Sequence, residues 1–529
     1  MAALLGAWVP TAAGAAPEEE AKAKEEMTVD EKIDQFFKPA TDGFSKVIFF
    51  NIYHSSEKDE DGKPLLSIPF ILVWLAGGAV FFTLFFKFVN LRSFGLALKT
   101  VRGKYSSPDD PGEITHFQAL TSAISGTVGL GNIAGVAVAI NTGGPGAAFW
   151  MLVLGICGMS SKFAECTLGV KFRQVGHDGK VHGGPMMYLT RGLADRGLGP
   201  LGKTLATVFA ILCVLGSLGG GNMFQVNQAV SQLVNVSGGA GSFVDANRFM
   251  FGIVLSVLVG MVIIGGISRI AVVTSKLVPV MTVIYVIGCL VVFFVHWDRI
   301  DDTFGLILSG AFNPQALGGG AIGVLLIGVQ RAAFSNEAGV GSAPIAHAAV
   351  KTRFAASEGL VALLEPFVDT VVICTMTALV VICTGDYLHT GKDGITITSD
   401  SFSSVIPWFK YVLSLAVILF ALSTLITWSY YGLQAWKFLF GKGRAADISF
   451  KVLFCMVMIV GAAMAPGNVI NFTDAALLGM CFPNLIGVYF LLPVVKRELK
   501  KFQAYAKRVD DGESLDRARG HVTSHYGEH

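Results

Sequence analysis

The sequence carries little charge for its length. Aspartate, glutamate, lysine and arginine make up only 15% of the 529 residues, whereas 53% are hydrophobic. Soluble globular domains carry about a quarter charged residues, so this composition excludes an ordinary soluble protein and indicates a polytopic membrane protein. The formal net charge is only +2, which provides no basic surface of the kind that binds nucleic acid.

The sequence also lacks the motifs of common metal, nucleotide and catalytic sites. Its eight cysteines lie in apolar runs without CxxC spacing, which predicts buried thiols and neither a disulfide framework nor a zinc site. Walker A and HExxH sequences are absent, and the GLGN run at 129–132 lacks the strand–helix context of a dinucleotide-binding loop. The ten histidines do not cluster within the predicted spans. We therefore expect a protein that is not an enzyme and holds no resident cofactor.

The sequence does contain apolar runs long enough to cross a membrane, and glycines interrupt one of them. The run 121–146, TSAISGTVGLGNIAGVAVAINTGGPG, has the ~20 mostly apolar residues that a spanning helix needs. Gly126, Gly129 and Gly131 crowd its middle, and each costs about 1 kcal/mol of helix stability relative to alanine. A break there frees backbone N–H and C=O groups, which at membrane depth must line a binding site or a wet cavity. Close packing of two helices on the small residues is the alternative.

A second run, 317–350, is interrupted in the same way at FSNEAGVG, halfway along its length. With the continuous runs it gives about eleven predicted spans, and basic residues cluster in the loops that would face the cytoplasm. This pattern places the N-terminus outside and the C-terminus in the cytoplasm, in a bacterial-type inner membrane. The predicted spans are 68–89, 119–141, 147–170, 204–234, 249–268, 277–295, 317–350, 358–384, 410–440, 451–465 and 472–495.

Setting the first span aside leaves ten, and the two interrupted spans open two groups of five. Because five is odd, the second group has the opposite orientation, and broken helices at matching places in inverted halves are typical of transporters. We predict an N-terminal extension at 1–66, with a secretory signal or a disordered tail at 1–16 and a peripheral helix or linker at 17–46. The further divisions are an extra helix and cytoplasmic loop at 67–104, repeats at 105–296 and 297–497, and a cytoplasmic tail at 498–529.

Seven motifs between about residue 68 and residue 497 resemble those of a known family. They are SGTVGLGNIAGVA (125–137), GGPGAAFWM (143–151), KFAECTLGVKFR (162–173), GGPMMY (183–188), GGGNMFQVNQ (219–228), FSNEAGVGSAPIAHA (334–348) and LSTLITWSYYG (422–432). On these motifs the chain resembles the alanine/glycine:cation symporters of the amino acid–polyamine–organocation superfamily. The resemblance implies an all-α polytopic membrane protein of about eleven transmembrane helices. These would form the five-plus-five inverted repeat of the leucine-transporter-type fold, with one extra N-terminal helix.

A zwitterionic amino acid needs donors for its carboxylate, acceptors for its ammonium and an apolar wall for its side chain. Backbone N–H groups at the first break would supply the donors, and residues 334–336 at the second break would bring carbonyls, a hydroxyl and an amide. The resemblance implies that Gln225, Thr424 and Trp428 also contact substrate. Trp428 would then limit substrate size, although an anchor at the membrane interface is its alternative role. The predicted substrate-binding residues are Gly129, Gly131, Asn132, Gln225, Phe334, Ser335, Asn336, Thr424 and Trp428.

Sodium is a hard cation, and hard cations take oxygen ligands. Thr127, the Val128 carbonyl and Asn132 at the first break, with Ser423 and Thr424 across the bundle, form the predicted sodium site. Hydroxyls inside helices often bond the carbonyl four residues earlier instead, but the resemblance implies a cation site at this place.

Charged residues at membrane depth are candidates for gating or coupling. Glu337 lies in the second break and Arg331 one turn before Ser335, while Glu365 and Asp369 are four residues apart in the next span. Ion pairs that hold the bundle together are the alternative for all of them except Glu337. For Glu337 we consider protonation during transport, or capping of the half-helix that follows.

The sequence therefore predicts a secondary active transporter that imports a small neutral amino acid, alanine or glycine, with sodium across a lipid bilayer. A proton-coupled symporter of the same fold is the first alternative. A non-transporting amino-acid receptor or channel on this scaffold is the second.

Overall fold

Helices make up most of the chain in the computed structural model. It describes residues 29–58, 62, 64–176, 179–313, 320–388, 394–464 and 466–526, so the predicted signal-like segment at 1–16 lies outside the described residues. The described strands form two short antiparallel hairpins, β1 (Asn51–His54) with β2 (Ser67–Pro69) and β3 (Gln174–Val175) with β4 (Val181–His182). The chain is therefore mostly helical, as predicted.

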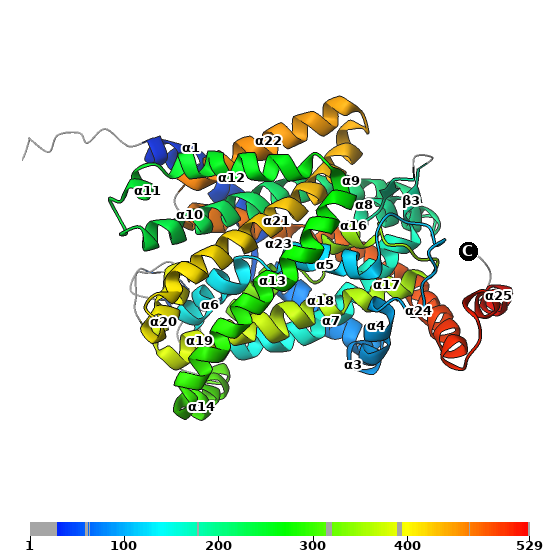
Figure 1. The fold of residues 1–529 in the computed structure, drawn as a ribbon, viewed down its shortest axis with the longest axis horizontal. Coiled ribbons are helices and arrows are strands. Elements are labelled where there is room, and N and C mark those ends of the chain that lie inside the picture. Colours follow the sequence, from blue (N-terminus) through cyan, green and yellow to red (C-terminus); the bar gives the residue numbers. More distant parts are fainter. Residues whose placement is uncertain are drawn as a thin grey trace, which may run out of the picture.

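The first half of the chain runs from α1 to α14 (Figure 1). Its helices are α1 (Val29–Ile48), α2 (Phe70–Phe85), α3 (Val89–Arg92), α4 (Phe94–Val101), α5 (His116–Thr127), η1 (Gly131–Gly135), α6 (Val136–Gly143), α7 (Gly146–Lys171), α8 (Pro185–Met187), η2 (Tyr188–Gly192), α9 (Gly199–Leu218), η3 (Gly219–Met223), α10 (Phe224–Val236), α11 (Phe243–Ala246), α12 (Arg248–Ile263), α13 (Gly266–Val295), η4 (Trp297–Arg299) and α14 (Ile300–Ala311).

The second half begins at the other interrupted run. Its helices are α15 (Gly320–Asn336), α16 (Ala343–His347), α17 (Ala355–Ala362), α18 (Leu364–Pro366), η5 (Phe367–Cys374), α19 (Thr375–Thr384), η6 (Asp386–Leu388), α20 (Gly394–Val405), α21 (Phe409–Phe440), α22 (Arg444–Ala463), α23 (Pro466–Gly479), α24 (Cys481–Asp510) and α25 (Leu515–Tyr526). Four of the η segments, η1, η2, η3 and η5, are π-helices that continue into neighbouring α-helices.

Seven helical stretches in the described residues are long and apolar enough to cross a membrane, and α5 with η1 and α6 forms an eighth if the bent pair is one span. The helices α2 and α12 are apolar but only 16 residues long, and α15 ends after 17 residues at its break. The chain thus has the helices of a multi-pass membrane protein, and the number of eleven spans stays a prediction. The seven are Gly146–Lys171, Gly199–Val236, Gly266–Val295, Ala355–Thr384, Phe409–Phe440, Arg444–Ala463 and Gly467–Asp510.

The outer helices have exposed apolar side chains on the face that points away from the rest of the protein. On α13, large apolar side chains recur every three or four residues and are about half exposed or more, whereas Met281, Tyr285 and Val292 on the opposite face are buried. A helix that is apolar on its exposed face as well as its buried face suits lipid rather than water. The exposed residues are Val280, Val283, Ile287, Leu290 and Phe294.

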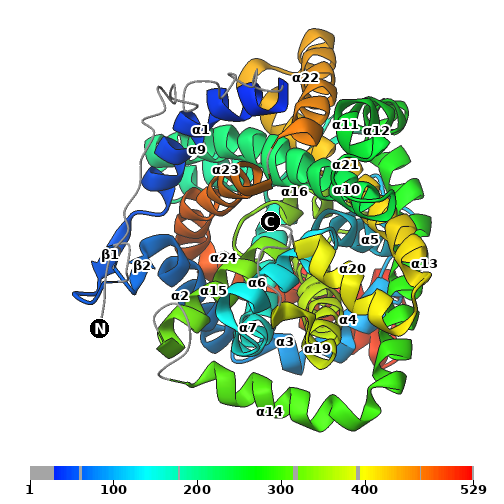
Figure 2. The same ribbon diagram turned by 90° about the vertical axis from the view of Figure 1, so that its left-hand side faces the viewer.

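The two interrupted spans lie inside the ring of outer helices. Figure 2 shows α5, α6, α15 and α16 near the middle of the bundle, with α12, α13, α14 and α22 toward its outside. The helix α5 packs against α13 and α21, and α15 packs against α7. Both breaks are therefore enclosed by protein, as the need to satisfy freed backbone groups requires.

Two regions outside the predicted spans are also helical. The acidic segment between the predicted spans 277–295 and 317–350 contains α14. The predicted cytoplasmic tail continues α24 to Asp510 and then forms α25. Figure 1 shows α25 and the end of α24 extending beyond the other helices at one end of the molecule.

Candidate functional site

The first break separates α5 from α6, and two side chains hold its backbone. The helix α5 ends at Thr127, and the two halves of the span are bent by 53°. The Gly129 N–H donates to Asn132 Oδ1 (3.0 Å), and the Leu130 N–H donates to Gln225 Oε1 (3.1 Å). Backbone donors that the sequence assigns to a substrate carboxylate are therefore occupied by amide oxygens in this structure.

The second break follows α15 and is tied to α21. The helix ends at Asn336, and the buried Glu337 has a φ of +54°, a conformation that non-glycine residues rarely adopt. Its carboxylate accepts hydrogen bonds from the Ser342 hydroxyl and from the Trp428 indole N–H, the latter at 3.1 Å. The predicted interruption at FSNEAGVG is confirmed, and Glu337 links it to α21 through Trp428.

The two breaks face each other across a small cavity. The first break comes so close to α15 that a Cβ added at Gly131 would lie 3.1 Å from the Phe334 ring. The cavity measures about 10 Å³, which is room for about one water molecule. An amino acid therefore needs side chains to move before it fits. The lining residues are Gly126, Thr127, Gly131, Gly220, Gln225, Phe334, Glu337, Trp428 and Leu477.

Trp428 forms one wall of this cavity. Its side chain is only 1% exposed, and its indole N–H also donates to the Gly126 carbonyl at 3.2 Å. It packs on Gly221, where an added Cβ would come within 2.2 Å of the tryptophan. A buried tryptophan bonded to both breaks is part of the cavity, so its alternative role as an anchor at the membrane interface does not hold.

Asn132, Ser335 and Asn336 turn away from the cavity, toward η5. Asn132 Nδ2 donates to Asp369 Oδ2 (2.7 Å), and the Ser335 hydroxyl donates to Asp369 Oδ1 (2.7 Å). Asn336 Nδ2 donates to the Thr370 hydroxyl (3.0 Å), which itself donates to Asp369 Oδ1 (2.7 Å). Asp369 thus joins the two broken spans through neutral donors, and none of the described basic residues forms an ion pair with it.

Glu365 and Asp369 do not act as a pair on one helix face. Glu365 Oε1 lies 3.1 Å from Lys162 Nζ, whereas Asp369 contacts the breaks. The π-helix η5 begins between the two residues, and its wider turn changes the angular spacing that four residues span in an α-helix. Glu365 and Asp369 therefore contact different parts of the bundle, and a gating or coupling role for each stays a prediction.

Among the predicted sodium ligands, Thr424 has a buried hydroxyl that makes no hydrogen bond to the described residues. It faces the first break, since a Cβ added at Gly129 would lie 2.5 Å from Thr424 Oγ1. The hydroxyls of Thr127 and Ser423 instead donate to carbonyls three or four residues earlier, which is the alternative noted for such residues. Val128 caps the end of α5 beside them.

Arg331 forms an ion pair between α15 and α23. Its guanidinium contacts Asp474, to which Gln330 also donates at 2.8 Å. The guanidinium carbon lies 5.7 Å from the centre of the Phe334 ring at the cavity. Arg331 thus connects a cavity-lining residue to a neighbouring helix, which suits a role in gating.

The sequence missed a buried group of ionisable residues. Glu358 contacts both His116 and His347, and all three side chains are at most 4% exposed. His116 and His347 are far apart in sequence and lie at helix ends, and only His347 falls within a predicted span, so their spacing in the sequence does not show that both contact Glu358. The spacing of Glu358 and Glu365, seven residues apart in one apolar span, could have indicated the group.

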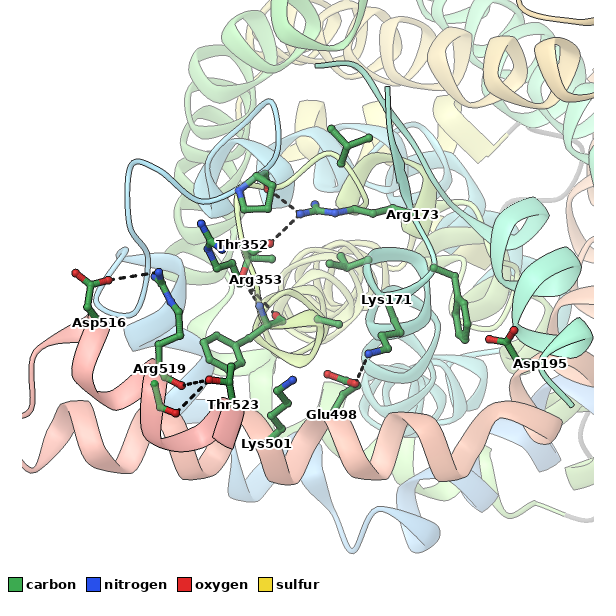
Figure 3. A pocket seen from close by; sticks show the side chains of 17 residues that line it. Lys171, Arg173, Asp195, Thr352, Arg353, Glu498, Lys501, Asp516, Arg519 and Thr523 are labelled. Carbon is green, nitrogen blue, oxygen red and sulfur yellow. Dashed lines mark hydrogen bonds and ion pairs between the residues drawn. The ribbon is translucent and has the colours of Figure 1, made fainter. Parts of the chain in front are cut away.

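A larger cavity of about 800 Å³ lies at the ends of α7 and α24, against α25 (Figure 3). Its charges pair with one another: Lys171 Nζ lies 2.7 Å from Glu498 Oε1, and Arg519 Nη1 lies 3.4 Å from Asp516 Oδ1. None of its lining residues lines the cavity between the two breaks. We assign these charges to the docking of α25 and not to substrate.

Comparison with known proteins gives a consistent set of relatives. The model of the sodium:alanine symporter family matches residues 60–516. A sodium/alanine symporter, AgcS, of Methanococcus maripaludis is 39% identical over 444 residues, which cover 83% of this chain and 95% of that protein. A probable sodium/glutamine symporter, GlnT, of Bacillus subtilis is 32% identical over 84% of this chain and 90% of that one.

Among solved structures, the crystal structure of MhsT in complex with L-phenylalanine is 14% identical, with a TM-score of 0.48. The match covers 73% of this chain and 99% of that one.

Proposed function

Because the chain belongs to the sodium:alanine symporter family, we propose that it imports alanine, glycine or a similarly small neutral amino acid together with sodium. The family consists of transporters, so the chain is a multi-pass membrane transporter and not an enzyme. The observation that carries the substrate proposal is the cavity between the two breaks. Trp428 and Phe334 close it to about 10 Å³, so only a small side chain fits after a modest rearrangement.

Gln225 is the side chain that we propose to move first. Its amide oxygen accepts from the Leu130 N–H, which is where a substrate carboxylate would bind the break. A carboxylate is a stronger acceptor than an amide, so substrate displaces Gln225 from that N–H and the cavity widens. The carbonyls of residues 334–336 at the end of α15, with Glu337, then accept from the ammonium.

Two features support sodium as the coupling ion. The Thr424 hydroxyl is buried at the first break with oxygen lone pairs available. Asp369 is a fully buried carboxylate that only neutral donors contact, and such a charge is costly at membrane depth without a cation. We propose that sodium binds among Thr127, Val128, Asn132, Ser423 and Thr424, with Asp369 supplying negative charge through Asn132. Sodium would order the break, so substrate and sodium raise each other's affinity equally.

We further propose the complete architecture that the sequence predicts. It has eleven spans, with the extra helix at 67–104, inverted repeats at 105–296 and 297–497, the N-terminus outside and the tail from 498 in the cytoplasm of a bacterial-type inner membrane. The bend between α5 and α6 and the break after α15 support this assignment, because they fall at corresponding places in the two halves.

Proton coupling is the second candidate, because Glu337 and Asp369 are buried carboxylates near the cavity that no described basic side chain pairs with directly. Uptake of radiolabelled alanine and glycine into proteoliposomes separates the two. Uptake driven by an inward sodium gradient and lost when choline replaces sodium supports the sodium proposal. Uptake that persists in choline and follows a proton gradient overturns it.

A further inference from the structure

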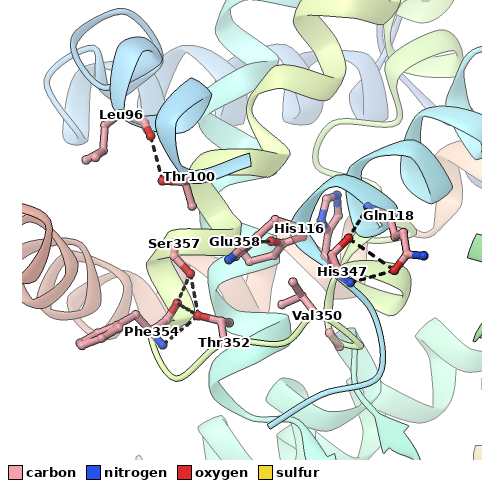
Figure 4. Close-up of polar contacts among 12 residues, drawn as sticks. Leu96, Thr100, His116, Gln118, His347, Val350, Thr352, Phe354, Ser357 and Glu358 are labelled. Atoms are coloured by element: carbon pink, nitrogen blue, oxygen red, sulfur yellow. Dashed lines mark hydrogen bonds and ion pairs between the residues drawn. The ribbon is translucent and has the colours of Figure 1, made fainter. Parts of the chain in front are cut away.

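Five buried ionisable side chains form a continuous chain of alternating charge type. Lys162 Nζ lies 3.1 Å from Glu365 Oε1, and Glu365 Oε2 lies 3.6 Å from His347 Nε2. His347 Nδ1 lies 2.5 Å from Glu358 Oε1, and the other oxygen of Glu358 contacts His116 Nδ1. Figure 4 shows His116 and His347 on either side of Glu358, each from a different element. Four of the five side chains are fully buried and His116 is 4% exposed.

The chain connects parts of both interrupted spans to the helices around them. His116 is the first residue of α5, which leads into the first break, and His347 is the last residue of α16, which follows the second break. Glu358 and Glu365 belong to α17 and α18, and Lys162 belongs to α7. Any movement of α5 or α16 away from α17 would therefore break this chain.

Charge balance requires one proton on the histidines. With both imidazoles neutral, the Lys162 ammonium faces two carboxylates and the five groups carry a net charge of −1. One imidazolium brings the sum to zero. An uncompensated charge in a dry interior is strongly unfavourable, so the buried chain is most stable with one added proton.

The geometry places that proton on His347. Its Nε2 and the Glu365 Oε2 atom face each other, both buried, and neither has a hydrogen-bond partner among the described residues. A neutral imidazole that donates from Nδ1 to Glu358 would direct the Nε2 lone pair at a carboxylate oxygen. An imidazolium donates from both nitrogens and satisfies both glutamates.

We propose that His347 binds a proton as an imidazolium between Glu358 and Glu365, and that this proton leaves when the cytoplasmic ends of α5 and α16 separate from α17. The proton goes from Nε2 to water, which leaves a neutral imidazole, and it returns from the same side when the ends close. The proton is thus a ligand of the closed arrangement, additional to sodium. The coupling to transport rests on the proposed function, whereas the bound proton does not.

Other ionisable groups lie near the chain, but no ion pair among the described residues joins them to it. From α7 these are Glu165, which accepts from Asn484 at 2.9 Å, and Cys166. Glu337 comes from the second break, Tyr431 from α21, and Arg173 from just beyond α7. Arg173 donates to the carbonyls of Ala348 and Val350 beside His347, so it fixes the backbone that follows His347.

Nitrogen NMR of the intact, histidine-labelled protein tests the bound proton directly. The signal lost in His347→Gln identifies residue 347, and His54, an exposed histidine bonded to Ser67, provides a matched control through His54→Gln. The expected result is that both ring nitrogens of His347 carry protons near pH 7.5. A neutral tautomer at His347 would overturn the proposal.

Transport tests the release step. In proteoliposomes of known orientation with a fixed sodium gradient, the pH on the cytoplasmic side of the protein is varied and the other side is held constant. Wild-type uptake should change with that pH, by up to about tenfold per pH unit, the limit for one proton. The response should vanish in His347→Gln and remain in His54→Gln. An equal pH response in His347→Gln and the wild type would refute the release step.

The two proposals fail in different ways. If wild-type protein shows no sodium-driven uptake at any pH, the proposed function is wrong, and the NMR measurement still decides whether His347 holds a proton. If His347→Gln does not fold, the wild-type signal can be assigned with Glu365→Gln, which removes the carboxylate charge that faces Nε2. Loss of the Nε2 proton in that variant supports the assignment, and an unchanged doubly protonated imidazole contradicts it.

Discussion

At the scale of single residues, the proposed cation site includes the buried Thr424 hydroxyl, which makes no hydrogen bond to the described part of the chain. Replacing Thr424 by valine keeps its shape and removes the oxygen, so we expect the half-saturating sodium concentration to rise by about tenfold, or about 1.4 kcal/mol. Thr424→Ser should keep near wild-type sodium dependence. Ser429→Ala is the control on the same helix, because that hydroxyl already donates to the Ile426 carbonyl at 2.7 Å. Sodium titrations of uptake measure all three, and wild-type coupling in Thr424→Val would exclude Thr424 as a ligand.

Trp428 should set the upper limit of substrate size. Trp428→Ala removes the wall between the two breaks, so we expect leucine and other large neutral amino acids to compete for alanine uptake, with weaker binding of alanine itself. The truncation also costs stability, about 3–5 kcal/mol for a buried aromatic, so melting temperature is measured alongside. Trp436→Ala on the same helix, where the indole bonds the partly exposed Ser449, should leave selectivity unchanged. If Trp428→Ala has the same competition profile as the wild type, Trp428 does not limit substrate size.

Sequence alone located several of these residues but not their partners. Trp428, Phe334, Gln225 and Gly131 all line the cavity. Asn132 and Ser335 were predicted as substrate contacts, yet both bond to Asp369. Donor side chains at a break have several acceptors within reach, and the choice among them depends on the register of η5, which one sequence does not reveal.

At the scale of elements, close packing requires a glycine at position 129 of the first break, in addition to any need for backbone flexibility. A Cβ at position 129 would lie 2.5 Å from Thr424 Oγ1 and 3.0 Å from Gln225 Oε1, whereas a Cβ at position 135, in the same span, meets nothing within 4 Å. We expect Gly129→Ala to abolish uptake while Gly135→Ala keeps at least wild-type stability. Uptake and thermal unfolding of both variants provide the comparison. Full activity in Gly129→Ala would show that the first break does not approach α21 so closely.

Glycine content predicted both interruptions, because glycine in an apolar run lowers the stability of a helix relative to alanine. The π-helices η1, η3 and η5 could not be predicted in the same way. A π-helix accommodates one extra residue per turn. Although η1 and η3 contain glycines, η5 contains none, so glycine content does not indicate where such a turn is placed. This difference explains why glycine content predicted the two breaks, whereas the π-helix that begins between Glu365 and Asp369 was not predicted.

At the scale of the whole molecule, an ion pair joins the C-terminal helix α25 to the segment that precedes α5. Asp110, which precedes α5, lies 3.1 Å from Arg353 Nε and 3.3 Å from Arg519 Nη2 of α25. We expect Arg519→Ala to speed hydrogen exchange over residues 515–526, whereas the exposed Arg517→Ala should not. High salt should have a smaller effect than the substitution, because the Asp110 side chain is only 5% exposed and buried ion pairs are screened much less than surface ones. Equal exchange in the two variants would mean that apolar packing alone docks α25.

Acidification should leave the same helix docked until the carboxylates protonate. Glu513, in the turn before α25, accepts from His521 and from Arg508, and these contacts lower its pKa below the usual value. A glutamate with a lowered pKa stabilises the folded state at pH values above about 4.3, which is the pKa of an unfolded glutamate. That stabilisation is lost as the pH falls below this value. Exchange over residues 515–526 should therefore be flat from about pH 8 to 5 after correction for intrinsic rates. A rise across that range would contradict the assigned contacts.

The thiol of Cys374 gives the protein a chemical reporter of its own. Its Sγ lies 3.3 Å from Asn132 Nδ2 and 3.1 Å from Ser335 Oγ, between the two broken spans, and it is 2% exposed. A small methanethiosulfonate reagent can reach that sulfur only while the spans are apart, so the modification rate of one native peptide, followed by mass spectrometry, measures how often they part. Sodium should slow that reaction if it draws the spans together, and the half-buried Cys157 and Cys455 serve as internal standards without any engineered label.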